Sequence, residues 1–287
     1  MSKIRFKELI MRYLIFLMLF SICHNCTQAQ NKILYKEIDS VKLYISVYYP
    51  PDYDTTKIYP AIVFFFGGGW INGDRKQFAQ HADYFSKRGA VCFLPDYRTK
   101  ENNSTPFHSL MDAKSAIRFV RGNANKFAID PDRIVASGGS AGGQLAAAAA
   151  LTDKFNEEKE NTSISCIPDA LVLFNPVLDN GPGGYGYERI GERYKDFSPI
   201  HNLKEGAPPT IIFSGTKDKL VSVPSLNYYK SIMDKLGSRC DLKWFEGETH
   251  GFFNYRNFKN FKETIITTDE FLQSLGYLTR EPLIEVQ

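Results

Sequence analysis

GGSAG at residues 138–142 fits the pattern G-x-S-x-G and separates two segments of opposite local preference. RIVAS at 133–137 is typical of a β-strand, whereas the alanine-rich run at 143–150 is a strong helix former. A strand, a tight turn and a helix are therefore predicted in succession. Glycines beside Ser140 remove the Cβ atoms that would clash in a strained turn. Taken alone, the motif also fits an ordinary turn of small residues.

The rest of the chain predicts strands that alternate with helices. We expect strands at 33–35, 41–49, 61–66, 90–94, 133–137, 170–174, 210–213 and 241–245, and helices at 77–88, 107–127, 143–150, 224–236 and 258–275. The run at 130–132 is predicted to be a turn before the strand at 133–137. An antiparallel start followed by alternation indicates an α/β protein whose mostly parallel sheet carries helices on both faces.

One glycine- and tyrosine-rich stretch, at about 179–206, departs from this alternation. A long insertion in a compact domain is often functional, which favours a lid or a wall of the substrate site. A solvated excursion packed by its own tyrosines is the alternative.

Residues 1–29 have the organisation of a secretory signal peptide. A basic start is followed by an apolar run at 13–22, too short to span a bilayer comfortably, and by a polar stretch that ends at Ala29. We expect cleavage after Ala29, a secreted or periplasmic domain at 30–287, and no stable membrane insertion afterwards. An uncleaved anchor is the alternative. Lipidation at Cys23 or Cys26 is disfavoured, because neither cysteine follows a small residue.

Charge and cysteine usage exclude several function classes. The chain has 35 Lys and Arg residues against 32 Asp and Glu residues. Once residues 1–29 are removed, 31 residues of each sign remain. This balance gives no support for nucleic-acid binding. Cys92, Cys166 and Cys240 remain, an odd number that does not indicate a disulfide framework. No Cys/His cluster has metal-ligand spacing, so no metal or organic cofactor is expected. The oligomeric state stays open.

A serine hydroxyl is a weak nucleophile that needs a base, and the base needs an orienting acid. Two histidines follow Ser140 in the chain. His250 comes directly after the strand at 241–245 and is the better candidate base, whereas His201 lies in the irregular insertion. An isolated histidine is more often structural, but this position after a strand is specific.

Asp218 is the candidate acid, because it lies in the loop that follows the preceding strand at 210–213. A turn residue paired with a neighbouring lysine is the alternative. Glu246 and Glu248 are weaker candidates, since they are too close in sequence to His250 to face its ring easily.

FGGGW at 66–70 follows a buried strand and indicates an oxyanion hole. Acyl transfer needs two or more N–H donors that point at one developing charge. The N–H of Gly68 or Gly69 would act with that of Ala141. A plain flexible loop is the alternative.

These motifs together resemble the α/β-hydrolase superfamily, in the esterase/lipase branch related to hormone-sensitive lipase and to bacterial acetyl-xylan and feruloyl esterases. The matching segments, in chain order, are FGGGW at 66–70, PDYR at 95–98, DPDRI at 130–134, GGSAGG at 138–143, Asp218, and HGF at 250–252. The resemblance implies an α/β-hydrolase fold and a catalytic set of Ser140, Asp218 and His250.

The sequence departs from the family pattern at two positions. Phe66 replaces the histidine that usually opens the glycine loop, so the loop must gain its rigidity from packing. Gly139 replaces the aspartate that the lipase branch often has before the nucleophile. Asp96 and Arg98 are interpreted as a brace for the glycine loop rather than as substrate contacts.

Four aromatic residues near the inferred site, Trp70, Tyr185, Tyr187 and Phe252, either stack on a sugar or aromatic acyl group or pack the insertion. The resemblance implies a secreted serine esterase that acts on acetyl or feruloyl esters of carbohydrate, with a small-molecule or polysaccharide ester as its partner. A carboxylesterase or lipase without a polysaccharide role, and a catalytically silent binding protein, are the alternatives.

Overall fold

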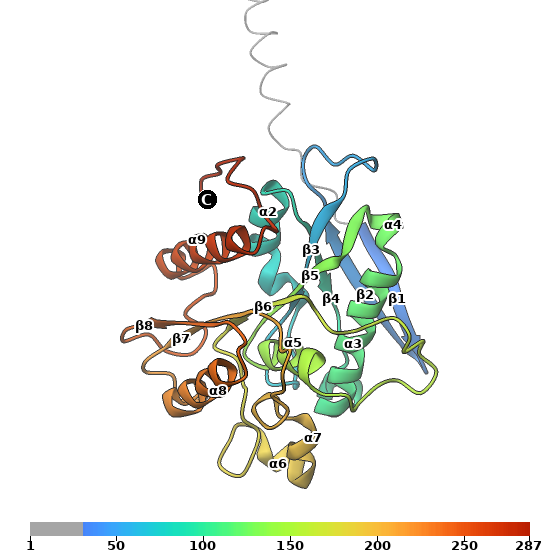
Figure 1. Cartoon of the computed structure of the whole chain (residues 1–287). Coiled ribbons are helices and arrows are strands. Elements are labelled where there is room, and N and C mark those ends of the chain that lie inside the picture. The colour runs from blue at the N-terminus through green and yellow to red at the C-terminus, as the bar shows by residue number, and fades with distance from the viewer. Residues whose placement is uncertain (1–30) are drawn as a thin grey trace, which may run out of the picture. The chain divides into compact units, whose positions relative to one another are not determined.

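A computed structural model describes residues 31–287, so the predicted signal peptide lies outside the described residues. These residues form an eight-stranded sheet in the order β1-β2-β4-β3-β5-β6-β7-β8 (Figure 1). The β1/β2 and β2/β4 pairs are antiparallel and the other pairs are parallel. The strands are β1 (Asn31–Ile38), β2 (Val41–Tyr48), β3 (Tyr59–Phe65), β4 (Val91–Pro95), β5 (Ile129–Gly139), β6 (Ala170–Phe174), β7 (Thr210–Gly215) and β8 (Cys240–Phe245). The predicted architecture is confirmed.

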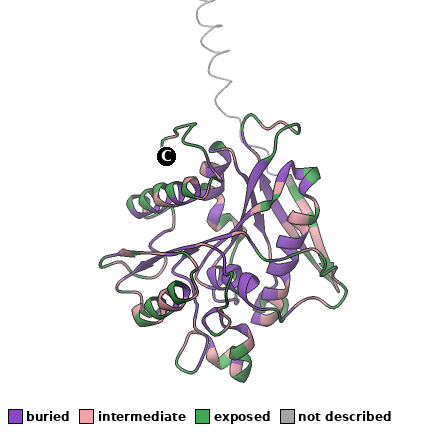
Figure 2. Cartoon of the chain, in the orientation of Figure 1, coloured by how far each residue is buried: buried purple, intermediate pink, exposed green. Residues whose placement is uncertain are grey.

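Helices cover both faces of this sheet because its central strands are apolar on both sides. In β3, Ile62 and Phe64 face one core cluster, and Ala61, Val63 and Phe65 face the other. The first face is covered by α2 (Ala79–Lys87) and α9 (Phe258–Ser274), and the second by α3 (Pro106–Gly122), α5 (Ala141–Leu151) and α8 (Val223–Lys235). Figure 2 shows the buried sheet between helices whose outer surfaces are exposed.

Two predicted elements differ in the structure. The helix expected at 107–127 is broken at Asn123, whose side chain donates to the Phe119 carbonyl, and a separate short helix α4 (Ala124–Phe127) follows. The turn expected at 130–132 lies within β5. There Tyr59 pairs with Ile129 and Ala61 with Ile134, so the extra residues of β5 form a bulge.

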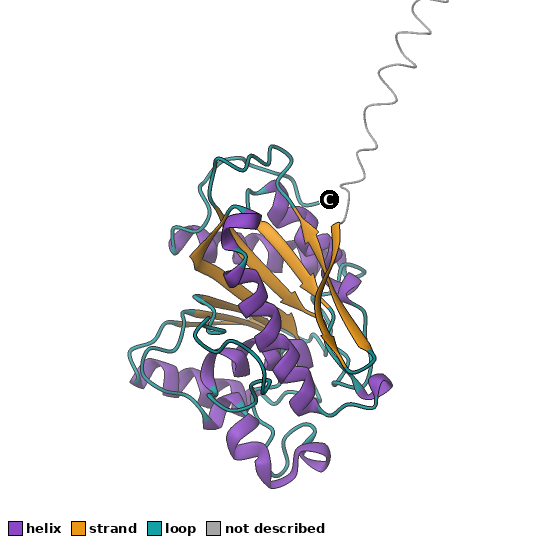
Figure 3. Cartoon of the chain, turned by 90° about the vertical axis from the view of Figure 1, so that its right-hand side faces the viewer, coloured by secondary structure: helices purple, strands orange, loops and turns teal. Residues whose placement is uncertain are grey.

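The insertion at 179–206 is more ordered than its composition suggests. It contains the short helices α6 (Tyr187–Ile190) and α7 (Tyr194–Phe197) and the 3-10 turns η4 (Gly191–Arg193) and η5 (Pro199–His201). Figures 1 and 3 show these elements beyond the end of α5, and the Gln144 side chain of α5 donates to the Phe197 carbonyl. Two further 3-10 turns, η2 (Arg75–Phe78) and η3 (Lys100–Asn102), flank β4. No helix within residues 31–287 is long and apolar enough to cross a membrane.

Candidate active site

Ser140 stands between β5 and α5 in a backbone conformation that side chains rarely adopt, with φ of +55°. Close backbone packing explains the flanking glycines. A methyl carbon on Gly142 would lie 2.1 Å from the Phe65 carbonyl oxygen, and one on Gly138 would lie 2.4 Å from the Gly142 carbonyl carbon. The strand-turn-helix predicted from the motif is therefore present, and the glycines are required by the contact with β3.

The structure brings the three predicted catalytic side chains together. His250 Nε2 lies 2.8 Å from Ser140 Oγ, and His250 Nδ1 lies 2.7 Å from Asp218 Oδ2. These residues follow β5, β7 and β8, whose carboxyl ends meet at one edge of the sheet. His201, the other histidine considered, is exposed and packs against Tyr194.

Asp218 is placed to stay ionised beside the imidazole. Its side chain is completely buried, which raises the pKa of Asp218, but hydrogen bonds from His250 and from the Leu220 and Val221 amides outweigh burial. The net result is a pKa of Asp218 below its ordinary value. An ionised, hydrogen-bonded carboxylate fixes the proton on Nδ1 and leaves Nε2 free to accept from Ser140.

The glycine loop lies directly beside the serine. A methyl carbon on Gly67 would be 3.4 Å from Ser140 Cβ, and the Gly67 N–H donates to Gln77 Oε1 at 2.7 Å. In the part of the chain that the structure describes, the N–H groups of Gly68, Gly69 and Ala141 have no hydrogen-bond acceptor. The predicted donor of Ala141 directly follows the nucleophile, and those of Gly68 and Gly69 belong to the loop whose Gly67 lies against Ser140.

Packing replaces the missing loop histidine, as the sequence predicted. The Phe66 ring stacks on Tyr97 with a centroid distance of 4.0 Å, and the Tyr97 hydroxyl donates to the Phe66 carbonyl at 2.7 Å. The glycine at 139 also has a physical reason, because a methyl carbon there would lie 2.4 Å from Phe253 Cζ. An aspartate before the serine would require this ring to move.

Two of the four proposed substrate contacts are core residues. Phe252 is only 3 % exposed and packs on Phe245, and Trp70 is 1 % exposed and packs against Tyr185 and Phe197. Burial in these clusters does not support direct stacking on a substrate.

The two tyrosines of the insertion differ from each other. The Tyr185 hydroxyl would lie 2.6 Å from a methyl carbon on Gly69, which places this side chain at the glycine loop. Tyr187 points elsewhere, because its hydroxyl donates to Glu192 and its ring packs on Tyr194. Of the four aromatic residues, Tyr185 is the one that the structure places at the loop with a partly exposed side chain.

Neither side chain of the predicted brace, Asp96 or Arg98, is hydrogen-bonded to the glycine loop among the described residues. Asp96 accepts from Arg75 at 2.5 Å, just after the loop, and the Lys100 N–H donates to the Trp70 carbonyl. Arg98 does not reach the loop. It pairs with Asp112 on α3 and with Glu157 instead.

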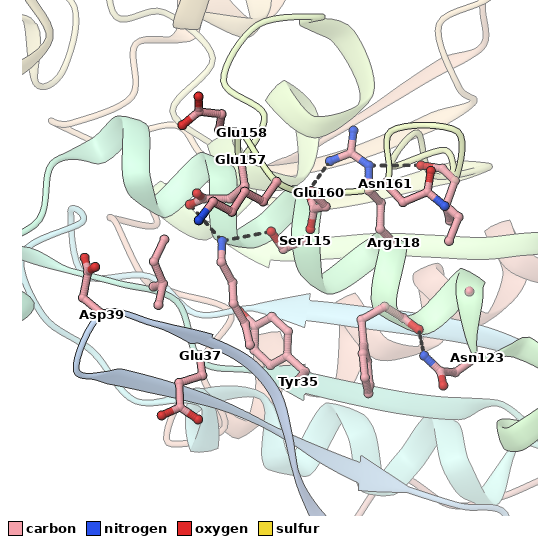
Figure 4. A pocket seen from close by; sticks show the side chains of 16 residues that line it. Tyr35, Glu37, Asp39, Ser115, Arg118, Asn123, Glu157, Glu158, Glu160 and Asn161 are labelled. Carbon is pink, nitrogen blue, oxygen red and sulfur yellow. Dashed lines mark hydrogen bonds and ion pairs between the residues drawn. The ribbon is translucent and has the colours of Figure 1, made fainter.

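Lys36 joins Arg98 in this ion-pair network, bonding to Asp112, Ser115 and Glu157. Beside it lies a cavity of about 730 Å³ between β1, α3 and the segment at 157–164 (Figure 4). None of the three predicted catalytic residues lines this cavity. A smaller cavity of about 170 Å³ lies between the insertion and the acid loop, lined by Tyr185 and Asp218 among others.

Comparison with known proteins places this geometry in a family. The chain is similar to structures of Thermogutta terrifontis esterase 2. The one phosphonylated by sarin is 38 % identical, with a TM-score of 0.85, and the match covers 88 % of this chain and 97 % of that one. The one with butyrate bound is 39 % identical, with a TM-score of 0.84 over 88 % and 96 % of the two chains.

The chain belongs to the α/β-hydrolase esterases. Residues 45–179 match the BD-FAE family. Esterase LipC of Mycobacterium tuberculosis is 29 % identical over 69 % of this chain and 54 % of its own length. Endo-1,4-beta-xylanase B of Butyrivibrio fibrisolvens is 30 % identical over 55 % of this chain and 27 % of its own length. The chain of this α/β-hydrolase esterase spans about half the length of the first two curated relatives.

Sequence reasoning missed two residues that contact the site of this α/β-hydrolase esterase. Asn175 touches His250 and its loop, and Arg189 of α6 donates to the Gly69 carbonyl. The sequence does hold a signal for Asn175: it is a polar residue directly after β6, the buried strand that neighbours the nucleophile strand β5. No local pattern marks Arg189. Within residues 31–287, no group of three or more His, Cys, Asp and Glu side chains is arranged to hold a metal.

Proposed function

We propose that this protein is a serine esterase that hydrolyses short-acyl carboxylic esters. The observation that carries the proposal is the continuous contact from Ser140 through His250 to Asp218, with unsatisfied N–H donors beside the serine. Nucleophile, base, orienting acid and oxyanion donors are the four parts that acyl transfer requires.

In the proposed reaction, Ser140 Oγ attacks the ester carbonyl while His250 Nε2 takes its proton. Asp218 stabilises the imidazolium, and the N–H groups of Gly68, Gly69 and Ala141 hold the developing oxyanion. His250 then protonates the departing alcohol oxygen. Water, deprotonated by the same nitrogen, hydrolyses the acyl-enzyme and releases the acid.

We further propose acetyl or feruloyl esters on carbohydrate as the natural substrates. Butyrate is bound in a structure of the similar Thermogutta esterase, and a xylanase is among the similar proteins. A signal peptide at 1–29 would bring the domain to extracytoplasmic polymers, so secretion or a periplasmic location is part of the proposal.

The direct test is hydrolysis of p-nitrophenyl esters from acetyl to decanoyl by residues 30–287 and by Ser140→Ala. We expect turnover confined to short chains and a loss of about 10³-fold or more in the variant. Release of acetate from acetylated xylan, and of ferulate from feruloylated xylan, then tests the carbohydrate part. Preference for decanoyl esters would favour a lipase. Hydrolysis of small esters with no release of acetate or ferulate from xylan would favour a general carboxylesterase. Silence on every ester would favour a binding protein.

A further inference from the structure

Asn175 is a buried polar residue that the proposed reaction leaves without a role. It follows β6 directly, its side chain is 0 % exposed, and its φ of +35° is one that asparagine tolerates better than most residues. Its backbone N–H donates to the Phe213 carbonyl of β7 at 2.7 Å, and the Phe174 carbonyl before it accepts from the Ser140 N–H. The residue is therefore fixed between the elbow and the neighbouring strand.

The orientation of the Asn175 amide follows from its partners. Its Oδ1 accepts from the Gly251 N–H at 3.1 Å, directly after the candidate base. A backbone N–H can only donate, so the oxygen must face Gly251 and the NH₂ group must face the other way. That places Nδ2 3.5 Å from His250 Nε2.

This orientation has a consequence for the imidazole. An amide NH₂ group only donates, so it is compatible with a lone pair on His250 Nε2 and disfavours a proton there. The ring proton is then held on Nδ1, which faces Asp218 at 2.7 Å. The same lone pair accepts from Ser140 Oγ at 2.8 Å. Asp218 and Asn175 therefore favour the same tautomer from opposite sides of the ring.

We propose that Asn175 is a positioning residue for the esterase reaction, which fixes the tautomer of His250 and anchors its loop through Gly251. The inference rests on the proposed function. Through its oxygen the residue anchors the loop that carries the ring, and through its nitrogen it disfavours the tautomer with a proton on Nε2.

Asn175→Asp separates these two roles. The carboxylate has the same shape and still accepts from the Gly251 N–H, but it presents an oxygen to His250 Nε2 in place of a donor. We expect kcat to fall about tenfold or more with KM nearly unchanged, and the acid limb of kcat/KM to move up by about one pH unit or more, because a nearby negative charge favours the protonated ring. Asn175→Ala, which loses both contacts, should also lower kcat.

The matched control is Asn260→Asp, which adds the same charge at a buried asparagine of α9 whose side-chain nitrogen has no partner among the described residues. We expect it to keep the wild-type kcat and pH profile. An Asn175→Asp enzyme with wild-type kcat and acid limb would overturn the inference, since a purely structural acceptor is preserved in that variant.

Nitrogen-15 NMR of the His250 ring gives a readout that does not depend on turnover. We expect the neutral ring to carry its proton on Nδ1, and Asn175→Asp to shift the population toward Nε2–H. A wild-type ring protonated on Nε2 would contradict the role of Asn175. If the ring has the expected tautomer but the chain hydrolyses no ester, the proposed function fails and the positioning geometry stands.

Discussion

The nucleophile elbow and the insertion at 179–206 both border the candidate site, but they are held in place by different forces. At the elbow, backbone atoms approach so closely that a single methyl on Gly142 would overlap the Phe65 carbonyl. In the insertion, Gly183, Gly191 and Gly206 have open space around them, and the glycine loop is contacted by side chains, those of Arg189 and Tyr185. Backbone constraints leave a mark in local sequence, whereas a single long side chain that reaches another loop does not.

The largest effect is expected where the elbow meets the acid loop. Asp218→Asn keeps the side-chain shape but donates to His250 Nδ1, which selects the wrong tautomer and should lower kcat about 10⁴-fold. Asp179→Asn is the matched control in the insertion, because Asp179 also accepts a backbone N–H, that of Gly181, at 2.9 Å. Steady-state kinetics on p-nitrophenyl acetate measure both. Equal losses of kcat in the two variants would contradict a specific role for Asp218 in orienting His250.

A pair of glycine substitutions tests the comparison through stability. Gly142→Ala should gain helix propensity, yet the 2.1 Å contact with the Phe65 oxygen is with backbone that cannot move aside, so we expect destabilisation by about 3 kcal/mol. Gly183→Ala adds a methyl where nothing lies within 4 Å and φ is +85°, which should cost about 1 kcal/mol. Denaturant unfolding compares them, and a smaller loss for Gly142→Ala would mean that the elbow relaxes.

The same difference explains how much the sequence predicted. The alternation of strands and helices, the glycine elbow and the chain positions of Ser140, Asp218 and His250 follow from local patterns, because each of the three residues follows a strand. The order of the strands in the sheet does not follow from such patterns. For Phe252 and Trp70 the sequence left two roles open, stacking on a substrate or packing, since aromatic residues look alike in sequence whether they pack in a core or line a pocket. Only the three-dimensional arrangement places Phe252 on Phe245.

A third prediction concerns the support beneath the elbow. His81 is completely buried, neither ring nitrogen has a partner among the described residues, and burial lowers the pKa of His81 to about 3. Its ring packs against the side chains of Phe64, Phe78, Phe174, Phe253 and Phe261. Of these, Phe253 fills the space beside Gly139.

An unfolded histidine titrates near 6.5, so between pH 6.5 and 3 the unfolded state binds the additional proton and stability falls as the pH falls. We expect this residue to account for a loss of about 2 kcal/mol between pH 7 and 5. The difference in unfolding free energy between those pH values should shrink by that amount in His81→Leu. His201→Leu, at the exposed ring of the insertion, should leave it unchanged, and an unchanged dependence in His81→Leu would show that another group is responsible.

The smallest effect is expected from the contact that joins the two regions. Arg189 Nη1 donates to the Gly69 carbonyl at 2.5 Å, and its guanidinium lies 5.3 Å from the ring centroids of Trp70 and Tyr185. Arg189→Met removes the hydrogen bond and keeps part of the apolar stem. Because a direct oxyanion donor is typically worth about 10²-fold or more in kcat, a residue that only orients the donor loop should be worth about tenfold.

Arg193→Met provides the control within the same insertion. Its guanidinium packs on Phe107 and Phe155, at 4.5 and 4.6 Å from their ring centroids, and no hydrogen bond to the glycine loop is found for it among the described residues. Both variants should lose about 1 kcal/mol of stability, but only Arg189→Met should lose kcat. Equal kcat in the two would mean that the insertion supports the site through packing alone. A selective loss would show that the insertion sets the geometry of the Gly68 and Gly69 donors through the Arg189 side chain.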